Sequence, residues 1–224
     1  LGPALAAGCT LVLKPAPDTP WSATMLGRLI AEHTDIPAGV VNVVAGTDHL
    51  LGEMLATDPR VDLVTFTGST ATGRRVMASA AATVKKVFLE LGGKSPTIML
   101  DDVDMPSALA QIGGVCAHAG QGCAITTRLL LPRSRYAEGV EIATQAFERF
   151  KYGDPMNPAH LMGPLISERQ RERVLGYIAK AKQEGAKLAA RGGVQKDLPK
   201  GYFVEPTLFV DVDPKSTLAQ EEVF

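Results

Sequence analysis

In the first 91 residues, short apolar runs alternate with helix-like stretches, and this alternation constrains the fold more than any other feature of the sequence. Strand-like runs occupy residues 10–13, 40–44, 61–66 and 84–89, and helix-like stretches occupy 21–32, 50–56 and 70–82. In the first helix-like stretch, Trp21, Met25 and Leu29 recur at helical spacing. Strands that alternate with helices pair in parallel through right-handed crossovers. The order of strands and helices therefore predicts a parallel sheet in an α/β fold, with its fourth strand ending at Gly92-Gly93.

The alternation restarts after Gly93, which indicates a second α/β region. Strands are expected at 97–100, 127–131 and 202–210, and helices at 105–118, 136–150 and 168–184. We place a domain boundary near Leu91. Residues 1–91 are expected to form part of one domain and residues 92–224 part of another.

Composition and charge exclude several classes of function. The formal net charge is −1 and the sequence pI is about 6.5, so no basic field attracts nucleic acid or an anionic membrane. No apolar run reaches the roughly 18 residues of a membrane span. The 3 cysteines include no C-x-x-C pair, which argues against a disulfide framework or a metal site and favours a reducing, cytoplasmic compartment. The chain opens without Met, and we treat it as an internal fragment.

The turn from Gly68 to Gly73, with the sequence Gly-Ser-Thr-Ala-Thr-Gly, is the first candidate motif. It follows an expected strand and opens an expected helix. Free N–H groups and the helix dipole at such a turn suit a phosphate. The motif is not a P-loop, because Arg74 and Arg75 replace the Lys and the Ser or Thr. The alternative is an ordinary helix capped by Ser69 or Thr70, and local sequence alone favours it.

Glu90 is the second candidate, because it follows the apolar run from Val87 to Leu89 and we expect that run to be buried. A desolvated carboxylate holds a proton more readily, which suits a general base. The alternative, commoner for an isolated Glu, is a strand-end side chain that faces solvent or pairs with Lys94.

Cys123 is the third candidate, because it ends the sequence Gly120-Gln121-Gly122-Cys123 in an expected loop. The glycines let the backbone turn tightly and leave room around the thiol. Thiolate formation also needs an electropositive or N–H-rich setting. We interpret Cys9 and Cys116 as buried structural cysteines.

Taken together, in this order and spacing, the motifs resemble those of the aldehyde dehydrogenase family. The resemblance covers essentially the whole chain. It rests on the segments 12–15 (VLKP), 37–42 (PAGVVN), 66–70 (FTGST), 89–96 (LELGGKSP), 120–123 (GQGC) with Arg128, 153–155 (GDP), 163–165 (GPL), 206–207 (PT) and 221–224 (EEVF). It implies a Rossmann-like portion of an NAD(P)-binding domain in residues 1–91. In residues 92–224 it implies part of an α/β catalytic domain of the aldehyde dehydrogenase type.

The resemblance also implies residue roles. Cys123 would be the nucleophile, and Glu90 would be the general base that activates water. The implied cofactor-binding residues are Lys14 at the adenosine ribose, Gly68 and Ser69 at the pyrophosphate, Gly73 and Leu91 beside them, and Glu222 at the nicotinamide ribose with Phe224 packed nearby. No metal is implied.

The implied reaction is oxidation of an aldehyde to a carboxylic acid with NAD, through a thiohemiacetal and a thioester on Cys123. NADP stays open as a cofactor, because Pro17 stands where the family often has Glu. His118 replaces an Asn that the family often has, and the family's second oxyanion donor, also an Asn, falls before Leu1. The partners implied are a small aldehyde and further copies in a homodimer or homotetramer. Two alternatives are a CoA-acylating relative, which typically lacks the general base, and a fragment without turnover.

Overall fold

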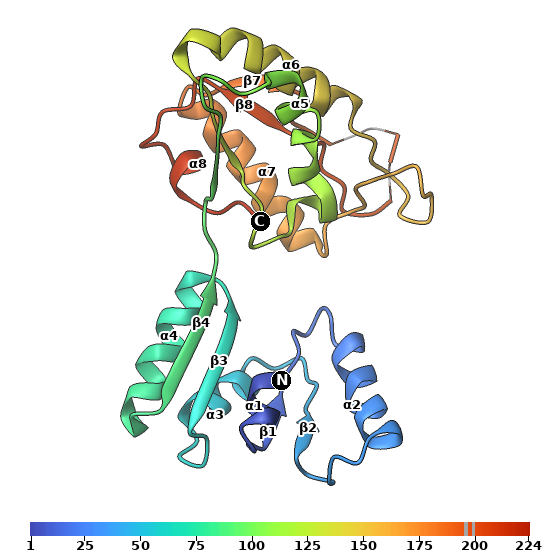
Figure 1. The fold of residues 1–224 in the computed structure, drawn as a ribbon, viewed down its shortest axis with the longest axis vertical. Helices are drawn as coiled ribbons and strands as arrows, with labels where there is room; N and C mark the ends of the chain where they lie inside the picture. The colour runs from blue at the N-terminus through green and yellow to red at the C-terminus, as the bar shows by residue number, and fades with distance from the viewer. Residues whose placement is uncertain (195–196, 199) are drawn as a thin grey trace. The chain divides into compact units, whose positions relative to one another are not determined.

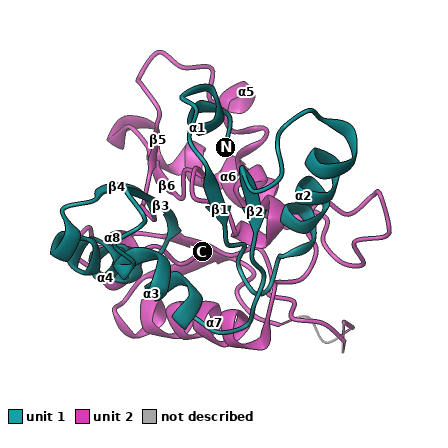
Figure 2. Ribbon diagram, turned by 90° about the horizontal axis from the view of Figure 1, so that it is seen from below, with its two compact units in different colours: residues 1–91 teal, residues 92–224 magenta. Residues whose placement is uncertain are grey.

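The computed structural model describes residues 1–194, 197–198 and 200–224 and divides into two compact units (Figures 1 and 2). Unit 1 is Leu1–Leu91 and unit 2 is Gly92–Phe224. Each unit mixes helices with strands, in keeping with the expected α/β fold class. The assignment of the units to a cofactor-binding and a catalytic domain stays a prediction.

Unit 1 contains two βαβ arrangements. Its elements are α1 Gly2–Ala6, β1 Leu11–Leu13, α2 Trp21–His33, β2 Val41–Val43, α3 Leu50–Thr57, β3 Leu63–Gly68, α4 Thr70–Ala80, a 3₁₀ turn η1 at Ala81–Thr83, and β4 Lys86–Leu91. Strand β1 pairs in parallel with β2, and β3 pairs in parallel with β4. The prediction of a single sheet is wrong for the described chain, because no ladder joins the two pairs. Each pair joins two strands that are connected by one crossover helix, α2 in the first pair and α4 in the second.

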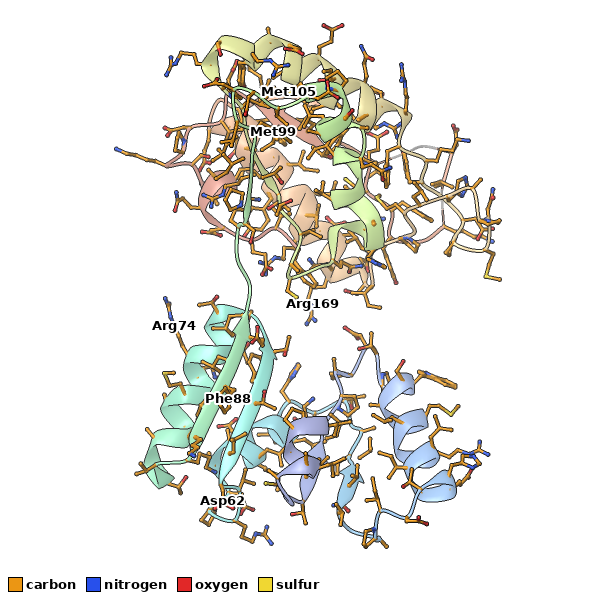
Figure 3. All side chains as sticks on the ribbon, viewed as in Figure 1. Asp62, Arg74, Phe88, Met99, Met105 and Arg169 are labelled. Carbon is orange, nitrogen blue, oxygen red and sulfur yellow. The ribbon has the colours of Figure 1, made fainter. Side chains whose placement is uncertain are left out.

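Helix α4 packs on one face of the β3–β4 pair. Side chains alternate between the faces of a strand, and the contact between Gly73 and Leu91 places Val87, Leu89 and Leu91 toward α4. Phe88, labelled on β4 in Figure 3, is 61% exposed. Phe88 and the exposed Glu90 therefore lie on the opposite face. The expectation that the whole run before Glu90 is buried is wrong within unit 1.

Unit 2 holds the remaining elements. They are β5 Pro96–Ile98, α5 Met105–Leu109, the 3₁₀ segment η2 Ile112–Gly120, β6 Arg128–Leu130, the 3₁₀ turn η3 Arg133–Arg135, α6 Tyr136–Arg149, α7 Glu168–Gln183, β7 Lys187–Ala190, β8 Leu208–Val210 and α8 Thr217–Gln220. Strand β5 is parallel to β6, and β7 is antiparallel to β8. Neither β7 nor α8 was expected from the sequence.

The predicted helix at 105–118 is wrong beyond Leu109. Helix α5 ends there, and the chain continues as η2, in which His118 and Ala119 adopt left-handed φ values of 54° and 56°. Gly113 explains part of the change, since a Cβ there would lie 2.9 Å from the Phe150 ring. Glycine destabilises a helix, and at position 113 the missing side chain lets the backbone lie close to the end of α6.

Both clusters of buried apolar residues in the described part of the chain lie in unit 2. One cluster contains Met99 and Met105, both labelled in Figure 3, together with Leu109. Met105 and Leu109 are 0% exposed. A second cluster contains Leu165, Ile178 and Val204. Full burial of one such side chain stabilises the fold by about 1.5–3 kcal/mol. These clusters fix η2, β6 and α7 around the loops that carry the candidate residues of unit 2.

Candidate active site

Cys123 lies in the loop between η2 and β6 and is exposed. Gly120 has a left-handed φ of 75°, which lets the chain turn before the cysteine. The side chain of Gln121 fixes this loop. Its Nε2 donates to the His118 carbonyl at 3.1 Å, and its Oε1 accepts from the Ile166 backbone N–H at 3.1 Å. The cysteine is therefore accessible on a loop that is tied to a distant part of unit 2.

The other two cysteines differ from each other. Cys9 is exposed, so the prediction that it is buried is wrong; it follows the short helix α1 and the left-handed Gly8 in an open turn. Cys116 is partly buried in η2, and burial raises the pKa of its thiol to about 12. A thiol with that pKa stays protonated at neutral pH and is a poor nucleophile. Cys123 is therefore the exposed thiol of unit 2.

His118 stands at the position where an Asn was expected by resemblance. It is exposed and left-handed, and its carbonyl accepts from both the backbone N–H and the side chain of Gln121. Its backbone thus shapes the turn before Cys123.

Glu90 lies one residue before the end of β4, opposite Thr67 of β3 in the parallel register. Its side chain is exposed on the face of the strands that α4 does not cover. Unit 1 by itself therefore does not bury this carboxylate, and the expected desolvation by the preceding apolar run is not found there. The carboxylate is open to water, which a general base must reach.

The turn between β3 and α4 has the geometry of a capped helix. Ser69 is the N-cap, with φ −69° and ψ 147°, and its Oγ accepts from the Thr72 N–H at 3.3 Å. Gly68 lies against the ring of Phe66. The ordinary capped helix and the phosphate site are compatible, because a capped helix start of this length still presents free N–H groups.

Gly73 and Leu91 are in direct contact, since a Cβ on Gly73 would lie 2.6 Å from Leu91 Cδ2. This contact seats α4 on β4, so the structure gives both residues a packing role beside the turn.

Lys14 is partly buried and follows β1. Its Nζ donates to the Pro15 carbonyl at 2.8 Å, and its Cε faces Gly52 of α3. Pro17 lies in the next turn, where the Thr19 N–H donates to the Ala16 carbonyl at 3.1 Å. That turn offers no carboxylate at position 17, and Asp18 beside it is exposed.

Lys94 is the centre of a charged cluster in unit 2, because the charges of both Arg128 and Glu222 act on it. The Glu222 carboxylate lies against Gly92. Burial and the charge of Arg128 lower the pKa of Lys94 to about 8, and the charge of Glu222 opposes this shift. Arg128 opens β6, and its Nε is buried without a hydrogen-bond partner among the described residues. The cluster therefore contains two cations, Lys94 and Arg128, and one carboxylate, Glu222.

Neither Lys94 nor Arg128 was expected from the sequence to have a functional role. Lys94 could have been considered, because only Gly92 and Gly93 separate it from the strand that carries Glu90. Nothing in the local sequence links Arg128 to Lys94. Phe224, the remaining candidate, is 40% exposed and follows Glu222 after one residue.

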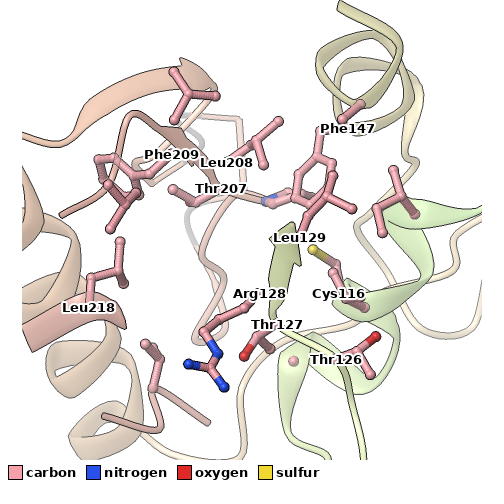
Figure 4. Close-up of a pocket in the computed structure, with 18 of the residues that line it drawn as sticks. Cys116, Thr126, Thr127, Arg128, Leu129, Phe147, Thr207, Leu208, Phe209 and Leu218 are labelled. Atoms are coloured by element: carbon pink, nitrogen blue, oxygen red, sulfur yellow. The ribbon is translucent and has the colours of Figure 1, made fainter. Parts of the chain in front are cut away.

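A mainly apolar cavity of about 870 Å³ occupies unit 2, with Cys116 and Leu129 on one side and Phe209 and Leu218 on another (Figure 4). Lys94 and Arg128 are among its polar lining residues, and Cys123 does not line it. Within the described ranges, no group of three or more His, Cys, Asp or Glu side chains could hold a metal. No described helix is both long enough and apolar enough to cross a membrane.

Comparison with known proteins gives a consistent picture. The model of the aldehyde dehydrogenase family matches residues 1–224. A 3-succinoylsemialdehyde-pyridine dehydrogenase of a Pseudomonas species is 43% identical over 226 residues, which cover 100% of this chain and 47% of that protein.

Solved structures agree with the sequence relatives. A Mycobacterium tuberculosis aldehyde dehydrogenase complexed with NAD⁺ matches with a TM-score of 0.95 and 49% identity, over 100% of this chain and 46% of that one. A mutant aldehyde dehydrogenase C of Pseudomonas syringae, complexed with NAD⁺ and octanal, matches with a TM-score of 0.94 and 38% identity, over 99% and 46%. The chain thus spans about half the length of the proteins it matches.

Proposed function

The chain belongs to the aldehyde dehydrogenase family, and we propose that the whole protein oxidises an aldehyde to a carboxylic acid with NAD, through a covalent intermediate on Cys123. The observation that carries the proposal is the accessible Cys123 on a loop anchored by Gln121. Residues 1–91 would be part of the NAD(P)-binding domain, and residues 92–224 part of the catalytic domain. We further propose a homodimeric or homotetrameric assembly in the cytoplasm.

Several features of the chain fit a dinucleotide. The start of α4 presents free N–H groups and the positive end of the helix dipole, which suit a pyrophosphate. Lys14 offers an ammonium donor for a ribose hydroxyl, and Glu222 offers a carboxylate acceptor. NAD⁺, when bound, supplies the acceptor for the hydride. The NAD⁺ held by the two structures named above supports this choice of cofactor.

The chemistry of the protein begins at Cys123. Its thiolate attacks the aldehyde carbon and forms a thiohemiacetal, whose oxyanion the Cys123 backbone N–H is expected to stabilise. Loss of hydride from that carbon leaves a thioester on Cys123. Glu90 takes a proton from water, the hydroxide adds to the thioester, and the carboxylic acid leaves as the thiolate is restored. The role of Glu90 rests on the resemblance of the segment 89–96 to the family's motif, and its exposed position on β4 leaves the carboxylate accessible to water.

Purified whole protein, mixed with NAD and octanal as the probe aldehyde, tests the proposal. We expect NADH and octanoic acid to form in equal amounts without added coenzyme A. Absence of NADH formation with a panel of aliphatic and aromatic aldehydes would overturn the proposal. A strict requirement for coenzyme A would instead assign the protein to the acylating branch.

A further inference from the structure

Helix α7 runs beside the segment 217–224 and contacts it at four points along its length. Glu184, the residue that caps the end of the helix, accepts from the Thr217 hydroxyl at 2.7 Å and from the Thr217 N–H at 2.9 Å. The Tyr177 hydroxyl donates to Glu221 Oε2 at 2.7 Å, and Arg173 Nη2 donates to the Glu222 carbonyl at 3.1 Å. The side chain of Gln170 donates to the Phe224 carbonyl. The helix and the segment run in opposite directions, since higher numbers on one meet lower numbers on the other. The helix therefore contacts the segment from its first residue to its last.

Two of these side chains support each other. The guanidinium of Arg173 lies over the ring of Tyr177, 5.6 Å from its centroid. Residues 170, 173 and 177 share one helix face because they are spaced by three and four. Burial and the bond to Glu221 raise the pKa of Tyr177, so its hydroxyl stays a donor at neutral pH.

Glu222 is held from both sides. On one side, Arg173 binds its carbonyl, and Tyr177 binds the side chain of the preceding Glu221. On the other side, its carboxylate rests on Gly92. With its backbone and its neighbour fixed, the direction of the Glu222 carboxylate is set by α7 as well as by local packing.

The same helix is tied to the nucleophile loop. Gln121 accepts from the N–H of Ile166, and the next residue, Ser167, is the N-cap of α7 and accepts from the Gln170 N–H at 3.3 Å. The loop that carries Cys123 and the segment that carries Glu222 are thus both fixed to α7.

We propose that Tyr177, supported by Arg173, is a positioning residue that holds Glu222 in a fixed relation to the Cys123 loop. The inference rests on the proposed function for the role of Glu222 at the nicotinamide ribose. The proposal gives Tyr177 no direct contact with the cofactor or the substrate. Its effect should therefore appear in binding of the nicotinamide half of NAD and should pass through Glu222.

The test measures dissociation constants of the whole protein for NAD and for ADP, which lacks the nicotinamide riboside. We expect Tyr177→Phe to weaken NAD about three- to tenfold, the range of one hydrogen bond, and to leave ADP unchanged. Adding Tyr177→Phe to Glu222→Gln should weaken NAD no further than Glu222→Gln alone. Tyr136→Phe is the matched control, because its hydroxyl also donates to a carboxylate, Asp211, at 3.0 Å, away from the segment 217–224.

An unchanged NAD constant in Tyr177→Phe, or equal losses for NAD and ADP, would overturn the inference while the proposed function stands. So would losses that multiply in the double variant. Wild-type protein that binds neither NAD nor NADP would overturn the proposed function and the inference together.

Discussion

The carboxylate of Glu222 lies directly against the Cα of Gly92, and a Cβ added to residue 92 would overlap its oxygens. Gly92 does not have a left-handed φ. Glycine is needed here because the carboxylate lies close to the backbone, and not because the backbone adopts a conformation that only glycine favours. The contact joins the start of unit 2 to a segment near its end.

Gly92→Ala should displace Glu222 and weaken NAD binding. Loss of a charge-assisted hydrogen bond predicts a roughly ten- to hundredfold rise in the dissociation constant. Gly93→Ala is the matched control, because no atom lies within 4 Å of the Cβ it would add. Fluorescence titration of the two whole-protein variants with NAD measures the difference. Equal affinities would show that Glu222 does not bind the cofactor from this position.

Alkylation should distinguish the three cysteines. At pH 8 we expect iodoacetamide to label the exposed Cys9 and Cys123 and to spare Cys116, whose pKa is raised to about 12 by burial. The Cys116 thiol stays protonated to a higher pH in the folded state than in the unfolded state, where its ordinary pKa is 9.0. The contribution of the protonated thiol to folding stability is therefore fully present below pH 9 and is lost as the pH rises toward 12. Peptide mass spectrometry reads the labelling. Fast labelling of native Cys116 would contradict the account.

Glu90→Gln should slow release of the acid more than formation of NADH, because the amide cannot take a proton from water. The expected signature in stopped-flow absorbance is a burst of NADH followed by a slow steady rate. Glu53→Gln, an exposed carboxylate on α3, is the control and should behave as wild type. An unchanged steady rate in Glu90→Gln would remove Glu90 as the base.

Pro17→Glu should sharpen the preference for NAD over NADP. Proline offers no acceptor to ribose hydroxyls and no charge against a 2′-phosphate. One charge-assisted hydrogen bond predicts a change of roughly ten- to hundredfold in the ratio of kcat/KM for the two cofactors. Wild-type protein should use NAD with weak discrimination. If the ratio does not move, the turn at Pro17 does not set cofactor choice.

Much of the fold could be predicted from local patterns. Helix α7 was expected at 168–184 and is found at Glu168–Gln183, because Ser167 caps its start and its apolar residues recur at helical spacing. The helix at 105–118 was predicted wrongly, because its apolar composition hid the effect of Gly113, which contacts Phe150 from a distant helix end. Such a contact depends on tertiary packing and has no local signal.

The candidate site shows the same division. Motif order was enough to identify Cys123, Glu90 and Glu222 as candidates. The sequence could not predict that Phe88 and Glu90 face away from α4, since that depends on which face the helix covers. The anchoring of Gln121 to Ile166 and of Glu221 to Tyr177 also joins residues far apart in the chain. These long-range contacts come only from the folded structure.

The central claim is that Cys123 carries the covalent intermediate, and trapping that intermediate tests it most directly. Glu90→Gln whole protein would be mixed with NAD and octanal, quenched in acid and digested for peptide mass spectrometry. We predict an octanoyl group in place of the thiol hydrogen on the Cys123 peptide, only when NAD is present, and none when Cys123→Ala is added. NADH formation that persists in Cys123→Ala, or an octanoyl group on Cys9 or Cys116 instead, would contradict the account.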